Sequence, residues 1–148
     1  MANITGSATT EIDAPLDAVW ASVQDVEGWA QWQSTLGEVS LEAQDGEGRV
    51  SECKIAIDAK LMKITMYLEC AYAPPARMSF ERTSGDLSKL EGSWTLDDLG
   101  DGRTRATYDL DVDPGGIGFL LNEERMEKLR ALLVDARPAE LKARVEGG

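Results

Sequence analysis

Apolar and polar residues alternate along most of the chain between residues 36 and 112, and this pattern predicts a series of β-strands. In an extended chain every second side chain lies on the same face, so the apolar residues of each stretch share one face. A weaker alternation, in a segment rich in threonine and isoleucine, predicts one more strand near the start. We predict seven strands in all, over residues 3–12, 36–42, 49–57, 62–70, 78–81, 90–97 and 105–112.

Two short helices are predicted directly after the first strand. Asp13-Ala14-Pro15 offers a capping carboxylate and a proline that suits the first turn of a helix. The apolar residues that follow recur at helical spacing up to about residue 25, and a second short helix is predicted over residues 27–32. This second helix places Trp29 and Trp32 three residues apart.

One long amphipathic helix is predicted in the last third of the chain, between residues 114 and 146. Arg137-Pro138 should kink or break it, because proline lacks a backbone donor and clashes with the preceding turn. We therefore expect only the part from residue 119 to about residue 136 to pack against the sheet. The apolar positions of this part recur at intervals of three and four residues and share one face: Phe119, Met126, Leu129, Leu133 and Ala136.

These elements predict an α+β fold. Antiparallel strands with one polar face leave that face in water and pack the other one. The long helix is the element best suited to cover the apolar face. We predict a curved seven-stranded antiparallel sheet wrapped around a long C-terminal helix, with two short helices after the first strand. Residues 1–148 contain no internal repeat and no linker, which predicts a single domain.

The charge balance excludes some partners. The chain has 15 basic and 27 acidic residues and a formal net charge of −12, which repels nucleic-acid phosphates and anionic lipid headgroups. The first residues lack the basic and apolar segments of a signal peptide, and no apolar run reaches the roughly 20 residues that span a bilayer. We therefore expect a cytoplasmic protein that binds no nucleic acid, is not stably inserted in membranes, and is a monomer or a weak homodimer.

The sequence offers little for metal, cofactor or nucleophile chemistry. It has no histidine, and its two cysteines, Cys53 and Cys70, lack the spacing of a zinc site. We predict no metal, no cofactor and no catalytic residue. If residues 59 and 60 form a two-residue turn, Cys70 falls opposite Arg49, roughly 13 Å along the strand from Cys53. That distance predicts two separate buried thiols and no disulfide.

Four motifs carry a resemblance to a known family. They are Ile-Asp-Ala-Pro-Leu-Asp-Ala-Val-Trp at residues 12–20, Asp-Val-Glu-Gly-Trp-Ala-Gln-Trp at 25–32, Gly-Ser-Trp-Thr-Leu at 92–96 and Gly-Arg-Thr-Arg-Ala-Thr-Tyr at 102–108. In this order the chain resembles the polyketide cyclase/dehydrase and lipid-transport superfamily, which shares the helix-grip fold of START domains and the major birch pollen allergen. The resemblance implies a cavity between the sheet and the last helix for lipids, quinones or polyketides. It carries over no catalytic residue.

The inward side chains of the central strands and the long helix are the candidate cavity lining, although each of them could instead be solid core. Tyr108 could orient a carbonyl or hydroxyl of a ligand, or bond the backbone. Asn122 could add a donor, or lie exposed in the first helical turn. The candidates are Trp32, Met62, Met66, Leu68, Phe80, Trp94, Tyr108, Asn122, Met126, Leu129 and Leu133.

Three functions follow from this reading. The first is binding or transport of an apolar small molecule without catalysis, which a mostly apolar cavity would support. The second is a polyketide cyclase or aromatase, for which the lack of histidine leaves tyrosine, arginine or a carboxylate to transfer protons. The third is a protein-interaction module with a filled interior and an exposed apolar patch.

Overall fold

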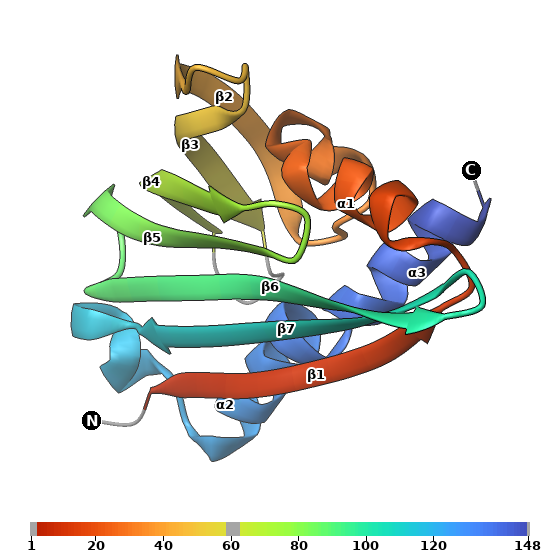
Figure 1. Cartoon of the computed structure of the whole chain (residues 1–148). Coiled ribbons are helices and arrows are strands. Elements are labelled where there is room, and N and C mark those ends of the chain that lie inside the picture. The colour runs from red at the N-terminus through yellow and green to blue at the C-terminus, as the bar shows by residue number, and fades with distance from the viewer. Residues whose placement is uncertain (1–2, 59–62, 148) are drawn as a thin grey trace.

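The computed structural model describes residues 3–58 and 63–147, apart from the side chains of residues 117, 119 and 120. As predicted, the strands form one antiparallel seven-stranded sheet. Figure 1 shows this sheet curving, with the C-terminal helical segment lying across one of its faces. The strands are β1 (Ile4–Ile12), β2 (Leu36–Gln44), β3 (Val50–Asp58), β4 (Lys63–Ala73), β5 (Arg77–Gly85), β6 (Lys89–Gly100) and β7 (Arg103–Asp113). Their order across the sheet is β1-β7-β6-β5-β4-β3-β2.

The two predicted N-terminal helices are present. Helix α1 (Leu16–Gln24) follows Pro15 and buries Val19, Trp20 and Val23, which lie at helical spacing. The 3-10 helix η1 (Val26–Gln31) comes directly after it. The indole nitrogen of Trp29 donates a hydrogen bond of 3.0 Å to the carbonyl of Val23, so the two helices are joined through a buried polar contact.

The C-terminal segment is more divided than the sequence predicts. A 3-10 helix, η2 (Gly115–Leu120), comes first, and α2 (Glu123–Arg130) begins only after it. A π-helical turn, η3 (Ala131–Asp135), then leads into α3 (Arg137–Gly147). The predicted break at Arg137-Pro138 is therefore confirmed, because Pro138 lies in the first turn of a new helix, where its missing donor costs little.

Helix α3 corrects one expectation about packing. The prediction that only residues up to about 136 pack against the sheet is wrong, since α3 contacts both β1 and β7 and buries Leu141 completely. The helical segment therefore extends further along the sheet than predicted. In the described part of the chain, no helix combines the length and the apolar character needed to cross a membrane.

The register between β3 and β4 also differs from the prediction. Asp58 pairs with Lys63 and Ile57 with Ile64, so the pairing is shifted by two residues and Cys53 lies opposite Leu68. Cys70 is then a close neighbour of Cys53, and the two thiols interact. The predicted separation of the two thiols is wrong, although both are free and buried. The interaction with Cys53, together with burial, raises the pKa of the Cys70 thiol above its ordinary value.

Candidate ligand-binding site

A small cavity lies between the sheet and the C-terminal helical segment. Its volume is about 40 Å³, and most of its wall is aliphatic or aromatic. Such a space holds a few water molecules, whereas pockets for organic ligands measure roughly 300–1,000 Å³. The wall is formed by Trp29, Gln33, Thr35, Leu36, Ile55, Ile57, Ile64, Leu68, Phe80, Leu87, Leu90, Tyr108, Leu110, Val112, Leu133 and Arg137.

The predicted lining residues fall into two main groups. Leu68, Phe80, Tyr108 and Leu133 line the cavity. The side chains of Met66, Trp94, Met126 and Leu129 are buried in the core without reaching it. The cavity therefore lies nearer one end of the sheet than the predicted set implies.

Three further predicted residues lie elsewhere. Trp32 is half-buried and packs on Trp94, with 6.2 Å between the ring centroids. Asn122 is exposed and caps α2, because its side-chain oxygen accepts a hydrogen bond of 2.8 Å from the backbone nitrogen of Arg125. It therefore follows the alternative reading for this residue and does not reach the cavity. Met62 lies outside the described residues.

Apart from Tyr108, the polar residues of the cavity wall are Gln33, Thr35 and Arg137, and we call the part of the wall that they form the polar end. Arg137 provides its charge and is only 3% exposed. One of its terminal nitrogens forms an ion pair with Glu140, which is also largely buried. The other donates a hydrogen bond of 2.8 Å to the hydroxyl of Thr35. A buried charge requires such partners, since an unpaired one is costly to remove from water. The ion pair therefore fixes the guanidinium at this position.

Tyr108 lies beside this ion pair, with the Arg137 guanidinium carbon 5.9 Å from the centroid of its ring. The same ring packs against Trp94 at 4.7 Å and against Phe80 at 6.3 Å between centroids. Burial raises the pKa of Tyr108 above its ordinary value, and the positive charge of Arg137 acts in the opposite direction. The phenol is consequently neutral at neutral pH and is available as a hydrogen-bond donor.

Two buried donors at this end have no acceptor. Neither Arg137 Nε nor Gln33 Nε2 has a hydrogen-bond partner among the described residues, and Gln33 is 7% exposed. Both residues line the cavity. The sequence reading missed both of them as site residues. The sequence does allow Arg137 to be predicted as a site residue, because it lies four residues after Leu133 and so falls on the same apolar helical face.

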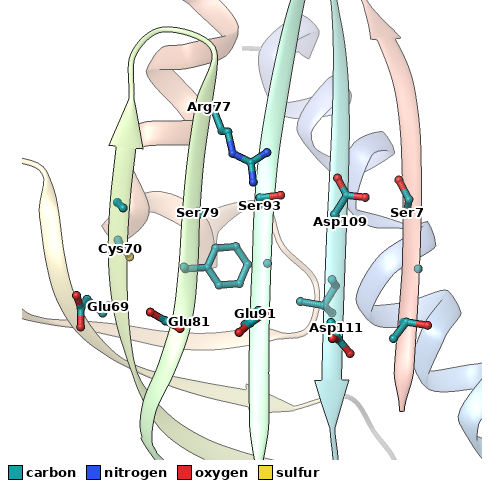
Figure 2. A pocket seen from close by; sticks show the side chains of 16 residues that line it. Ser7, Glu69, Cys70, Arg77, Ser79, Glu81, Glu91, Ser93, Asp109 and Asp111 are labelled. Atoms are coloured by element: carbon teal, nitrogen blue, oxygen red, sulfur yellow. The ribbon is translucent and has the colours of Figure 1, made fainter. Parts of the chain in front are cut away.

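A larger hollow of about 760 Å³ lies on the opposite, outer face of the sheet. Figure 2 shows Glu69, Glu81, Glu91 and Asp111 in a row across four strands, and cross-strand pairing places each directly opposite the next. The adjacent row, with Ser79 and Ser93, consists mainly of small side chains, which explains the depression. Its wall is acidic and open, so it does not suit an apolar ligand. Among the described residues, no group of acidic or cysteine side chains is arranged to hold a metal ion.

Comparison with known proteins identifies the family. Residues 3–146 match the family model for polyketide cyclase/dehydrase and lipid transport. An uncharacterised protein of Pseudomonas aeruginosa is 27% identical over 120 residues, which are 72% of this chain and 59% of that protein. The chain thus spans less than two thirds of the length of this relative.

Solved structures of other proteins share the fold. A START superfamily protein from Mycobacterium smegmatis matches with a TM-score of 0.83 and 21% identity, over 97% of each chain. The Zhui aromatase/cyclase from a Streptomyces species matches with a TM-score of 0.79 and 17% identity, over 98% of this chain and 94% of that one. With a family model that covers nearly its whole length, this chain belongs to the polyketide cyclase/dehydrase and lipid transport family.

Proposed function

We propose that this protein binds an apolar small molecule between the sheet and the C-terminal helical segment and does not transform it. The observation that carries the proposal is the cavity at that position, aliphatic and aromatic over most of its wall and polar at one end. An apolar enclosure with a few placed polar groups is the usual form of a small-molecule site. Membership of a family that includes lipid-transport proteins supports the same function.

The cavity must expand to bind a ligand, because its present volume of about 40 Å³ is too small for an organic molecule. Two residues of its wall have unusual backbone conformations. Leu133 belongs to the π-helical turn η3, a conformation that is rare and frequent at functional sites. Leu87 has a φ of 71°, which is a strained conformation for a leucine. These two residues close the cavity from the helix and from the turn between β5 and β6. We infer that they move apart when a ligand enters.

A second candidate function is cyclisation of a polyketide-like chain, as in the Streptomyces aromatase/cyclase of the same fold. The observation that favours it is the buried Tyr108 beside Arg137, because a phenol near a guanidinium can donate a proton. We rank it second, since burial raises the pKa of Tyr108 and so makes this phenol a weaker proton donor. Its test is turnover of an aromatic polyketide precursor, with Tyr108→Phe as the inactive control.

An interaction module is the least favoured function. Only two large apolar side chains are exposed among the described residues, Leu41 at 39% and Tyr67 at 37%. They lie on β2 and β4, and β3 separates these strands. Two such residues do not form an apolar patch of the size that marks a protein interface.

Native mass spectrometry of the protein, purified without denaturation, tests the binding function. We expect a fraction of the protein to carry a non-covalent apolar adduct. Leu133→Trp should fill the cavity and abolish the adduct, whereas Leu41→Trp, the same change at an exposed position, should retain it. An adduct that survives Leu133→Trp unchanged, or no adduct together with no change in melting temperature from any lipid or quinone, contradicts the proposal.

A further inference from the structure

We propose that the polar end of the cavity recognises a neutral carbonyl oxygen, so that the ligand is an apolar ketone, quinone or ester. The oxygen would accept hydrogen bonds from Nε of Arg137 and Nε2 of Gln33. This inference rests on the proposed binding function and specifies its ligand class.

The first step concerns the type of the unpaired atoms. Arg137 Nε and Gln33 Nε2 are both donors, both are buried, and both lack an acceptor among the described residues. A buried donor without an acceptor costs free energy, so the site favours any ligand that supplies one. An ammonium group supplies only donors, and a hydrocarbon supplies neither donors nor acceptors. The complementary group is an oxygen with free lone pairs.

The second step concerns position. Thr35 accepts a hydrogen bond of 2.8 Å from Arg137 and lies two residues after Gln33 in the connection between η1 and β2. This contact holds the connection against the start of α3. Gln33, Thr35 and Arg137 all line the cavity. The two unpaired donors therefore belong to one end of one site.

The third step concerns charge. Glu140 already neutralises Arg137, and the two side chains are 16% and 4% exposed. The other carboxylate oxygen of Glu140 accepts a hydrogen bond of 2.8 Å from the backbone nitrogen of Ser34, so this carboxylate is held in place. A ligand carboxylate would add an uncompensated negative charge beside Glu140, and burying such a charge is costly. A neutral carbonyl satisfies the donors without this cost.

The fourth step concerns the rest of the ligand. The rest of the wall consists mainly of aliphatic and aromatic residues, many of them from paired strands, such as Leu90 opposite Val112 and Ile57 opposite Ile64. The aliphatic side chains among them offer no polar group. The carbonyl must therefore lie at one end of an apolar chain or ring system.

The test compares ten-carbon probes that differ only in their end group: methyl octyl ketone, decanoate, decylamine and decane. Isothermal titration calorimetry measures the affinities, because it detects binding of all four probes whatever their end group. We expect the ketone to bind about tenfold more tightly than decane and at least tenfold more tightly than decanoate or decylamine. In Gln33→Met the preference for the ketone over decane should shrink, whereas in the apolar control Leu68→Met it should persist.

The outcomes separate this inference from the proposed function. Equal affinities for all four probes, or tightest binding of decanoate, overturn the carbonyl inference and leave the binding function standing. No binding of any probe overturns both. The chemical shift of the Arg137 Nε–H proton gives a readout that needs no variant. It should move downfield on addition of the ketone and not on addition of decane, and an unchanged shift with bound ketone contradicts the inference.

Discussion

A Cβ atom on Gly92 would lie 2.2 Å from Cζ of Phe80, so the phenyl ring packs directly over the backbone of β6. The ring lies between Trp29, at 5.6 Å, and Tyr108, at 6.3 Å between centroids. The absence of a side chain at residue 92 thus sets the position of an aromatic wall of the cavity. Gly92→Ala should push the ring away and lower the free energy of unfolding by about 1–3 kcal/mol. Urea denaturation measures this change.

A second substitution separates steric overlap from a general effect on the strand. Phe80→Leu shortens the side chain, so Gly92→Ala should cost less stability in that background than in the native protein. Equal costs in the two backgrounds would show that the ring and the glycine are not coupled.

The ion pair between Arg137 and Glu140 should show a strong asymmetry between single and double substitution. Glu140→Gln leaves the buried guanidinium without its counter-charge and should lower the free energy of unfolding by about 3–5 kcal/mol. Arg137→Met combined with Glu140→Met removes both charges and should cost less than Glu140→Gln alone. Chemical denaturation of the two variants tests the order, and the reverse order would mean that the pair is not effectively buried.

Alkaline pH should destabilise the fold through Tyr108, which is buried, and Tyr72, which is half-buried. Burial raises the pKa of Tyr72 and of Tyr108 above the ordinary value of 10.0. Above about pH 10 the unfolded chain loses these phenolic protons while the folded chain retains them, so stability falls as the pH rises. Below about pH 10 both states are protonated, and this contribution is constant. Denaturation curves between about pH 8 and about pH 11 measure the slope.

The substitution Tyr72→Phe measures how much of this dependence of stability on pH comes from Tyr72. The hydroxyl of Tyr72 donates a hydrogen bond of 2.6 Å to the carbonyl of Val50. Its removal should lower the stability at neutral pH by about 0.5–1.5 kcal/mol and make the loss above about pH 10 shallower. A slope identical to that of the native protein would rule out Tyr72 as a contributor.

The acidic row on the outer face should be a source of repulsion. Glu81 lies directly opposite Glu69 on one side and Glu91 on the other, and like charges at paired positions destabilise a sheet. Lys89 offsets part of this at one end, where its ammonium lies 2.8 Å from Asp111 and 3.7 Å from Glu91. Its hydrogen bond and charge lower the pKa of Asp111.

Glu81→Gln should therefore raise the free energy of unfolding by about 0.2–1 kcal/mol at low ionic strength. The gain should shrink in about 1 M salt, where screening acts over about 3 Å. Glu47→Gln removes the same charge from the exposed turn between β2 and β3 and serves as the control. If both substitutions have the same effect at low salt, net charge and not the row is responsible.

The sequence predicts correctly those features that depend on the periodicity of apolar residues. Alternation identifies which side of a strand is apolar, so Leu68, Phe80 and Tyr108 were correctly placed on the inner face. It does not fix the register, because a slip of two residues preserves every face. This is why the pairing of β3 with β4 was predicted two residues away from its position, and Cys53 and Cys70 were wrongly separated.

The polar end of the cavity is a second feature that the periodicity of the sequence does not predict. Gln33 lies in an irregular connection, where no periodicity predicts whether a side chain is buried. Arg137 lies at the helical spacing of the apolar stripe, but it directly precedes Pro138, which predicts a break in the helix at this point. The partners that make its burial tolerable, Thr35 and Glu140, become apparent only when the chain is folded.

The central claim, that a ligand lies between the sheet and the C-terminal helical segment, is tested most directly by nuclear Overhauser effects between methyl octyl ketone and labelled methyl groups. The inner cavity has Leu68 and Leu133 in its wall, and the outer hollow has Ala71. We predict contacts from the alkyl chain to the methyl groups of both leucines and none to Ala71. Contacts confined to Ala71, or no contact to either leucine at saturating ketone, would contradict the claim.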